Sequence, residues 1–471
     1  MSSGSAAALP LQGELEALRT AFAAGAPDYR ARSDALKRLA AALRGHQDAL
    51  AKAVDEDFGG RPDAETLLLE LFLLYDQIRH ARRHLRGWMR RRRVRGTWFL
   101  LPSRAFYQYQ PLGVVGIIGA WNYPVLLTLG PAIDAIAAGN HVMIKPSELA
   151  PRTAAIIDLI VREAFSAEHV RCVTGDADVA RAFSALPLDH LLFTGSSRIG
   201  REVMRAAADN LTPVTLELGG KSPAIIHGSY PLALAVNRIM TAKLCNAGQT
   251  CVAPDYVLLP GGAEAEFEAQ ARRAADALYP DLPRNPDYTH IINDGHQERL
   301  QTLLADARDK GARIVELAEG AAHTRLMPPT LLFGVTDAMT IMQEEIFGPL
   351  LPVVTYRTLE DAIGYVNGRP QPLALYYFDD DRSRQTYMLK FTRSGGVTIN
   401  DCLYHLGQHR LPFGGVGASG MGHYHGFDGF VTFSKKRPVM LQRRVAATAL
   451  LHAPWAPRQW LIKAMLRIVS G

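Results

Sequence analysis

The sequence predicts an α/β protein with a doubly wound parallel sheet followed by a second α/β domain. Short apolar strand candidates alternate with helical stretches between residues 113 and 208, and a second strand–helix series begins past residue 217. Such alternation is typical of a parallel sheet covered by helices, an architecture that suits a nucleotide. The length of 471 residues exceeds what one ordinary core supports, so two or three lobes are expected.

The region before the first strand is predicted to be helical over residues 12–98. Leucine and phenylalanine recur there at intervals of three and four residues, which is the spacing of one helix face. The recurring residues are Leu15, Leu18, Phe22, Leu36, Leu39, Leu43 and Leu50. The segment 65–75 is densely apolar, which favours a buried helix at that point.

Two series of strands follow, each made of short apolar runs that are typical of strands buried on both faces. The first series has strand candidates at 113–119, 141–144 and 190–193, with helical stretches at 128–138, 151–165 and 199–208. The second series has strand candidates at 222–226, 256–259, 313–315, 351–354 and 396–399.

This order predicts two domains, an arm and a tail. Residues 106–110 alternate in polarity ahead of the first buried strand, so we expect a hairpin arm that serves oligomerisation and pairs with residues 428–440. The predicted units are 14–105 with 113–216, then 217–420, then the arm (106–112 with 428–440), and lastly a tail, 441–471.

The tail is predicted to end in a short amphipathic helix over residues 458–469. Gln459, Lys463 and Arg467 fall on one stripe at four-residue spacing, and most of the remaining residues are apolar. Such a helix can lie in a membrane interface or dock on the partner subunit. Docking on protein is favoured, because a lone short amphipathic helix binds bilayers weakly, but peripheral membrane contact stays open.

Composition describes an ordinary soluble globular protein, with 48% hydrophobic and 21% charged residues. Much of the net charge of +6 is local, since nine arginines crowd the segment 79–95. That cluster could meet nucleic acid or an anionic membrane. The favoured interpretation is a solvated helix end at which the aliphatic parts of the arginine side chains cover apolar surface. No nucleic-acid partner is therefore expected.

The cysteines and the chain ends predict a cytosolic setting. Cys172, Cys245, Cys251 and Cys402 form neither a disulfide framework nor a paired metal-binding pattern, so no metal is expected. The first ten residues lack the cationic start and apolar core of a secretory signal. No uncharged apolar run reaches the roughly 18 residues that a membrane-spanning helix needs.

Cys251 is the candidate nucleophile. It follows the flexible run Ala-Gly-Gln-Thr, which can bring a thiol to the mouth of a cleft and close to a carbonyl group. Its reactivity depends on the thiolate fraction, which is small at an unperturbed pKa of about 8.5. The motif is weak alone, because a free cysteine is more often an inert buried apolar residue.

Two motifs follow strand candidates in the first series. Asn122, in Ala-Trp-Asn-Tyr-Pro, offers an amide donor for a developing oxyanion, although an Asn before a loop Pro can simply stabilise a turn. Lys145, in Lys-Pro-Ser-Glu, can meet a phosphate or a ribose hydroxyl, and Glu148 can accept from a ribose hydroxyl. A solvated Lys–Glu pair is the alternative.

Three further motifs carry glycines or carboxylates. Gly195 and Ser196 begin a strand-to-helix turn whose backbone amides can approach a pyrophosphate, although the turn is not a GxGxxG fingerprint. Glu217 lies between two leucines, which raise a carboxyl pKa and suit a general base. In Glu-Glu-Ile-Phe-Gly-Pro, Glu345 offers a carboxylate for a ribose and Phe347 a ring for a nicotinamide face.

Together these motifs resemble those of the NAD(P)-dependent aldehyde dehydrogenase superfamily, over residues 15–440. The run Pro412–Gly426 is similar to that of the class 3 branch, which includes fatty-, aromatic- and bacterial coniferyl-aldehyde dehydrogenases. The resemblance implies an aldehyde dehydrogenase-like fold with a Rossmann-type cofactor domain, a catalytic domain and a small β oligomerisation arm. It also implies a homodimer that acts on a small-molecule aldehyde. Ala120, where many relatives have Pro, is a minor departure.

The resemblance also implies the roles of individual residues. Cys251 attacks the aldehyde, Asn122 and the Cys251 backbone N–H hold the oxyanion, and Glu217 activates the water that releases the acid from a thioester. The implied cofactor contacts are Trp121, Lys145, Glu148, Gly195, Ser196, Glu345 and Phe347. Tyr123 and residues 403–409 would line the substrate tunnel. Glu148 should repel a 2′-phosphate, so NAD is expected to be preferred while Lys145 leaves NADP tolerated.

Three alternatives remain. A CoA-acylating or phosphorylating dehydrogenase shares the fold, but its chemistry needs no carboxylate base such as Glu217. A non-catalytic protein that keeps only the fold would not need a nucleophile, a donor and a base together. A third protein class would bind RNA or a membrane through the arginine cluster, and salt-dependent nucleic-acid binding would reveal it.

Overall fold

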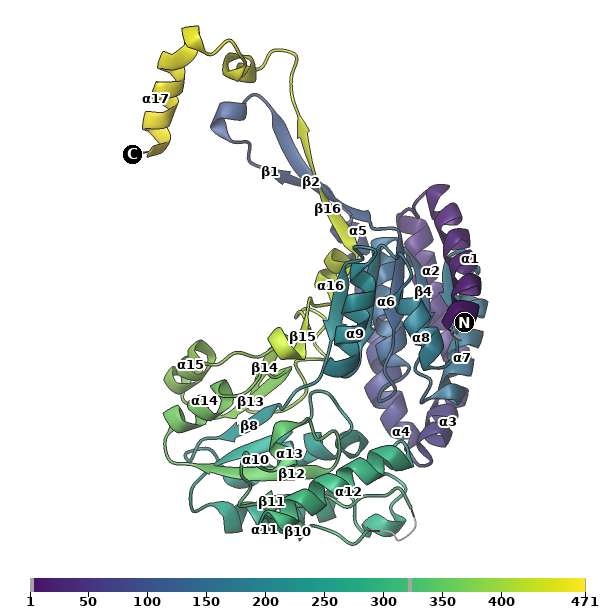
Figure 1. The fold of residues 1–471 in the computed structure, drawn as a ribbon, viewed down its shortest axis with the longest axis vertical. Helices are drawn as coiled ribbons and strands as arrows, with labels where there is room; N and C mark the ends of the chain where they lie inside the picture. The colour runs from purple at the N-terminus through teal and green to yellow at the C-terminus, as the bar shows by residue number, and fades with distance from the viewer. Residues whose placement is uncertain (1–3, 321–323, 471) are drawn as a thin grey trace.

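The computed structural model describes residues 4–320 and 324–470 and confirms the predicted α/β class. Two sheets lie in two lobes, and a third, three-stranded sheet forms an arm that extends away from both (Figure 1). The six-stranded sheet has the order β15-β7-β6-β3-β4-β5 and the seven-stranded sheet the order β10-β11-β12-β9-β8-β13-β14. The arm has the order β1-β2-β16.

The N-terminal region is helical as predicted, but only as far as Trp88. Its elements are α1 (Gly4–Ala23), α2 (Tyr29–Gly45), α3 (Gln47–Phe58), α4 (Asp63–Thr66), the π-helix η1 (Leu67–Leu71) and α5 (Phe72–Trp88). The prediction was wrong beyond that point, because Arg92–Val94 is a strand, β1. Its residues pair with β2 (Arg104–Pro111), Arg92 opposite Tyr107, and this pairing outweighs the local helical pattern.

The first lobe holds five parallel strands in the order β7-β6-β3-β4-β5, and β15 (Gly420–Met421) pairs antiparallel with β7 at one edge of the sheet. Its elements are β3 (Val114–Ile118), α6 (Leu126–Ala138), β4 (His141–Lys145), α7 (Pro151–Ala164), β5 (Val170–Cys172), α8 (Ala177–Ser184), β6 (His190–Thr194), α9 (Ser197–Ala208) and β7 (Val214–Glu217). Helix α1 packs against α8, and α2 packs against α5, α6 and α7, so helices cover both faces. Leu15 and Leu18 of α1 share a core cluster with Val114, Met143 and Leu191.

The second lobe repeats the strand–helix alternation. Its strands are β8 (Pro223–Ile226), β9 (Tyr256–Pro260), β10 (Arg313–Glu316), β11 (Thr330–Phe333), β12 (Leu350–Tyr356), β13 (Ala374–Phe378) and β14 (Gly396–Ile399). Its helices of nine residues or more are α10 (Leu232–Leu244), α11 (Glu264–Leu278), α12 (Asp294–Asp309), α14 (Leu359–Asn367) and α15 (Arg382–Phe391). Every strand pair is parallel except β10–β11.

The strand pairing expected in the arm is present, with one correction, while its role in oligomerisation stays a prediction. Strand β16 (Ser434–Leu441) pairs antiparallel with β2 along its whole length, Ser434 opposite Pro111 and Leu441 opposite Arg104. Residues 428–432, which were predicted to be part of this strand, belong instead to helix α16 (Gly426–Thr432). That helix packs against α5 and α6, so its apolar face is buried in the first lobe before the chain enters the arm.

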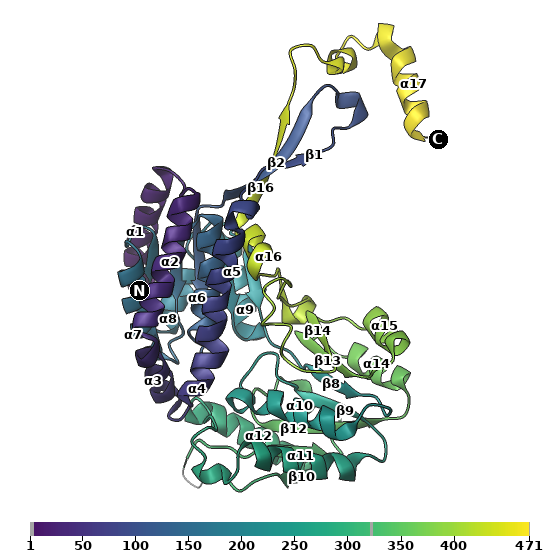
Figure 2. The same ribbon diagram turned by 180° about the vertical axis from the view of Figure 1, so that it is seen from behind.

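The tail ends in helix α17 (Gln459–Ser470), as predicted, and the helix lies beyond the tip of the arm (Figure 2). None of its described side chains is buried within the chain. None of the helices in residues 4–320 and 324–470 combines the length and hydropathy that crossing a bilayer requires.

Asn140 joins the arm to the first lobe. Its side-chain oxygen accepts from the amides of Leu112 and Gly113 (2.7 and 3.1 Å), between β2 and β3. Its amide group donates to the carbonyls of Ala135 and Phe433 (3.0 and 2.8 Å), in α6 and just before β16. The side chain is fully buried, so these four bonds compete with no water.

We predict that Asn140→Ala lowers the free energy of unfolding by about 2–4 kcal/mol, because the amides of Leu112 and Gly113 and the Phe433 carbonyl lose their side-chain partner. Urea denaturation followed by circular dichroism measures this change. A loss below about 0.5 kcal/mol would show that the backbone groups find other partners.

Candidate active site

Most of the predicted site residues lie at one edge of the six-stranded sheet. Trp121 and Asn122 follow β3, Lys145 ends β4, Gly195 and Ser196 follow β6, and Glu217 ends β7. Strands β7, β6, β3 and β4 are adjacent and parallel, so their carboxyl ends meet at the same edge. In open α/β sheets this edge is where ligands bind.

The loop that carries Cys251 belongs to the second lobe and has an unusual backbone. Asn246 and Ala247 have positive φ angles of 52° and 50°, which non-glycine residues rarely adopt. Gly248 follows at 76°, and a side chain there would lie 2.3 Å from the carbonyl oxygen of Gly348. Such conformations persist only where the surroundings hold them, and they concentrate at functional sites.

Hydrogen bonds join this loop to the loop that carries Asn122. The Asn122 side-chain amide donates to the Gln249 carbonyl (3.1 Å), and the Asn246 side-chain amide donates to the Asn122 carbonyl (2.9 Å). The Tyr123 hydroxyl lies 2.8 Å from the Thr250 hydroxyl. The structure therefore brings the candidate oxyanion donor and the candidate nucleophile together from the two lobes.

The thiol and the two carboxyls near it are electrically coupled. Burial, together with the neighbouring carboxyls of Glu345 and Glu217, raises the pKa of Cys251 to about 12. Burial likewise raises the pKa of Glu217 well above its usual value. Among the described residues, neither Glu217 carboxyl oxygen has a hydrogen-bond partner, so this group is free to bind a water or a ligand.

The predicted cofactor residues form two groups. Lys145 is fully buried, and its ammonium donates to the Glu148 carboxylate (2.9 Å). Ser196 caps the N-terminus of α9, where backbone amides favour phosphate. The rings of Trp121 and Phe347 lie 5.3 Å apart, and Phe347 has a positive φ of 52°.

Three polar residues that sequence reasoning missed hold the loop before Phe347. Lys221 donates to the carbonyls of Ile341 and Glu344 (2.7 and 2.9 Å). Asp255 accepts from the Ile346 amide (2.9 Å), and Arg299 donates to the carbonyl of Glu345 (3.2 Å). Lys221 directly follows the two glycines of the Leu-Glu-Leu-Gly-Gly-Lys run. Its place in that motif was the signal in the sequence that could have indicated a role at the site.

Burial also raises the pKa of the Glu345 carboxyl to about 8, with Asp255 adding to the shift. The Gly219 backbone approaches that carboxyl so closely that a Cβ there would lie 2.0 Å from its oxygen. A glycine at position 219 therefore leaves room for this carboxyl beside the backbone.

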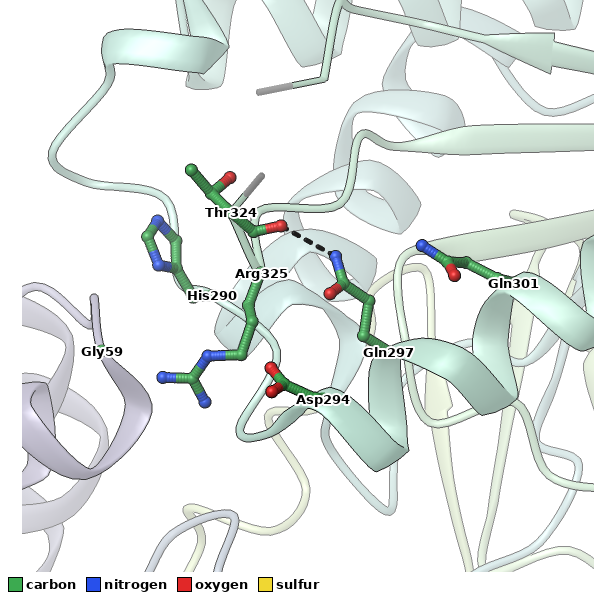
Figure 3. Close-up of a pocket in the computed structure, with 7 residues that line it drawn as sticks. All are labelled: Gly59, His290, Asp294, Gln297, Gln301, Thr324 and Arg325. Atoms are coloured by element: carbon green, nitrogen blue, oxygen red, sulfur yellow. Dashed lines mark hydrogen bonds between the residues drawn. The ribbon is translucent and has the colours of Figure 1, made fainter. Parts of the chain in front are cut away.

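A separate polar pocket of about 500 Å³ lies near the end of α3 (Figure 3). It is lined by Gly59, His290, Asp294, Gln297, Gln301, Thr324 and Arg325. Gln297 donates across it to the Thr324 carbonyl (2.9 Å). None of the predicted site residues lines this pocket, and within the described ranges no group of three His, Cys, Asp or Glu is placed to hold a metal.

Comparison with known proteins agrees with this architecture. Residues 15–439 match the aldehyde dehydrogenase family, and the chain belongs to that family. It is therefore an enzyme that oxidises aldehydes.

Its relatives include a probable coniferyl aldehyde dehydrogenase of Pseudomonas aeruginosa, 51% identical over 91% of this chain and 90% of that one. Among solved structures, the substrate-bound state of Staphylococcus aureus AldH has a TM-score of 0.92 at 36% identity, covering 97% of this chain and 99% of that one. A Mycobacterium tuberculosis aldehyde dehydrogenase complexed with NAD+ has a TM-score of 0.81 at 29% identity, covering 92% and 90%.

The raised pKa of Cys251 yields a prediction for the free enzyme. Below the pKa the thiolate fraction rises tenfold for each pH unit, so alkylation of Cys251 by iodoacetamide should rise about tenfold per unit from pH 6 to 9 without a plateau. Mass spectrometry of the Cys251 peptide measures the rate, with buried Cys402 as an internal control. A plateau below pH 8 would contradict the raised pKa.

Proposed function

We propose that this enzyme oxidises medium- to long-chain aliphatic or aromatic aldehydes to carboxylic acids through a covalent Cys251 intermediate, with NAD as the preferred cofactor. The observation that carries the proposal is that Asn122 and the Cys251 loop are hydrogen-bonded to each other. The Glu217 carboxyl, which has no hydrogen-bond partner among the described residues, also lies close enough to raise the pKa of the Cys251 thiol. The name of the P. aeruginosa relative favours a coniferaldehyde-like substrate.

Each step of the proposed mechanism is assigned to a residue of the candidate site. Cys251 loses its proton to solvent, its thiolate attacks the aldehyde carbon, and the resulting oxyanion accepts hydrogen bonds from the Asn122 side chain and the Cys251 backbone N–H. A bound nicotinamide would supply the hydride acceptor, and loss of the hydride from this carbon would leave a thioester on Cys251. Glu217 then removes a proton from water, the water oxygen attacks the thioester carbon, and the C–S bond breaks to release the acid.

The residues at the sheet edge fit a nicotinamide dinucleotide. The N-terminus of α9 at Ser196 can receive the pyrophosphate, and the Lys145–Glu148 pair can bind the ribose hydroxyls. Glu148 is partly exposed and anionic, which disfavours a 2′-phosphate, while the neighbouring Lys145 leaves NADP tolerated. Glu345 and Phe347 would hold the nicotinamide end, and Tyr123 with residues 403–409 would line the aldehyde tunnel.

Reduced-nicotinamide formation across a panel of aldehydes tests the reaction. We predict turnover from hexanal and decanal to benzaldehyde and coniferaldehyde, with a higher kcat/KM for NAD than for NADP. Cys251→Ala should abolish acid formation while it still binds NAD in a calorimetric titration. Turnover that requires added CoA or phosphate would overturn the hydrolytic mechanism, and turnover by Cys251→Ala would overturn the assignment of the nucleophile.

Glu217→Gln separates the two halves of the reaction. Because the carboxylate would act only on water, we predict a normal burst of reduced cofactor followed by a steady state at least about 100-fold slower. Stopped-flow absorbance at 340 nm resolves the two phases. Equal loss of both phases would contradict a role confined to hydrolysis of the thioester.

We further propose a homodimer formed through the arm. Strand β16 ends the arm sheet and strand β14 ends the seven-stranded sheet, so each has an unpaired edge among the described strands. Unpaired edges of this kind template strand addition. The β16 edge of one copy adding to the β14 edge of the other would produce one extended sheet.

Charge favours the same partner for the tail. Residues 90–111 and 434–471 hold fourteen of the 52 lysines and arginines and none of the 46 acidic residues, which leaves 38 cations against 46 acids elsewhere. A second copy therefore offers an acidic surface to this cationic arm and tail. Helix α17 exposes Trp460, Ile468 and Val469 at 71%, 68% and 65%, which docking on that copy would cover.

We predict that deleting residues 456–471 raises the dimer dissociation constant by about tenfold or more, because this apolar surface is no longer buried. Sedimentation velocity of both proteins over a concentration series measures the change. An unchanged constant, together with binding of the full chain to anionic vesicles that the deletion abolishes, would assign the tail to a membrane surface instead.

A further inference from the structure

A buried ion pair lies behind the Asn122 loop. Arg61 lies just before α4 and Glu70 lies in η1, at the end of the helical layer that faces the second lobe (Figure 2). Their side chains are each 0% exposed, and Arg61 Nη2 lies 3.4 Å from Glu70 Oε1. Burial raises the pKa of Glu70, whereas the Arg61 charge lowers it. Neither residue belongs to the motifs that carry the proposed chemistry.

The pair holds the Asn122 loop at two points. Arg61 donates to the Asn122 carbonyl (2.9 Å), and its guanidinium lies 4.8 Å from the centre of the Tyr123 ring. Glu70 accepts from the amides of Val125 and Leu126 (2.8 and 3.0 Å), where α6 begins. One ion pair therefore fixes the backbone on either side of Tyr123, directly after the Asn122 side chain.

The same segment also reaches the nucleophile loop. Glu65, in α4, accepts from the Asn246 backbone amide and from the Thr289 hydroxyl. Asn246 in turn donates to the Asn122 carbonyl, which thus receives hydrogen bonds from both Arg61 and Asn246. Three charged residues of one ten-residue segment consequently fix the two loops relative to each other.

Stability alone does not account for the pair. Removing two charges from water costs more than their attraction usually returns, so apolar residues of similar size are often as stable. The geometry here is also not optimised for bonding, because Arg61 Nε and Nη2 and Glu70 Oε1 have no hydrogen-bond partner among the described residues. The pair supplies a directed donor to the Asn122 carbonyl and a directed acceptor for two amides. Apolar residues could supply neither.

We propose that Arg61 and Glu70 are positioning residues that set the Asn122 amide at the place where the oxyanion forms. This inference rests on the proposed function, because the oxyanion arises only if Cys251 attacks an aldehyde. Neither side chain touches the reacting atoms. Their effect should therefore pass entirely through Asn122 and should appear in the first chemical step, before the thioester is hydrolysed.

The test compares Arg61→Met with a matched control, Arg32→Met. Arg32 is also buried, and it donates to the carbonyls of Ala137 and Ala138 (3.2 and 2.7 Å) at the opposite end of α6. In single-turnover stopped-flow, Arg61→Met should lower the burst rate constant by about 10–100-fold, because a misplaced donor forfeits most of its effect. NAD affinity and the alkylation rate of Cys251 should stay within about twofold. Arg32→Met should lower the unfolding midpoint and leave the burst rate constant unchanged.

A double-mutant cycle supplies the sharper readout. In an Asn122→Ala background, Arg61→Met should cause no further loss of burst rate, because the group through which it acts is gone. Additive losses would overturn the proposal, as would a burst rate constant for Arg61→Met within twofold of the wild type. Absence of a burst in the wild type with every aldehyde would instead overturn the proposed function.

Conservative variants keep the test decisive if Arg61→Met fails to fold. Arg61→Lys retains a buried cation beside Glu70 but supplies a less directed donor, so it should recover part of the burst rate. Glu70→Gln keeps an oxygen for the Val125 and Leu126 amides but leaves Arg61 without its counter-charge. It should slow the burst less than Arg61→Met does. Wild-type burst rates in both folded variants would overturn the proposal.

Discussion

The hydrogen bonds between the Asn122 loop and the Cys251 loop are the constraint on which the rest of the site depends. Each loop belongs to a different lobe, so neither lobe contains the site by itself. The Asn122 carbonyl accepts from Arg61 and Asn246, and the Gln249 carbonyl accepts from the side chains of Asn122 and Asn246. Each of these two carbonyls accepts one hydrogen bond from each lobe. A displacement of either lobe therefore moves the candidate donor and the candidate nucleophile together.

The structure sustains local strain around this junction. Ala247 and Phe347, on neighbouring loops, have positive φ angles of 50° and 52°, and such conformations cost of order 1–3 kcal/mol each. Directed polar contacts offset this cost: Gln249 alone donates to the Asn246 and His290 carbonyls and accepts from the Ile292 amide, at 3.0 Å each. A buried side chain bonded in this way rigidifies its surroundings, which is what precise placement of a thiol requires.

Sequence patterns predicted the parts of this site that are periodic or carried by local motifs. Short apolar runs located β3, β4 and β6 of the six-stranded sheet, and a motif after each of these strands placed Asn122, Lys145 and Ser196 at one edge. Strand β1 was missed, because pairing with β2 rather than local propensity creates it. Arg61 and Glu70 were missed because their function depends on contacts with a loop some 55–60 residues away. The only available signal was the charge of Glu70 within the apolar segment 65–75. A charged residue in such a segment is expected to be buried and paired, but the sequence does not identify the group that it binds.

Burial disfavours negative charge in this site, and this has a consequence for the chemistry. Burial raises the pKa values of both Cys251 and Glu217, because it disfavours their charged forms. A thiolate or an alkoxide in the same place is costly to bury unless a donor stabilises it. Negative charge would therefore form only when a donor is already in position to receive it. That requirement makes the placement of Asn122, rather than the intrinsic reactivity of the thiol, the feature that the surrounding structure must maintain.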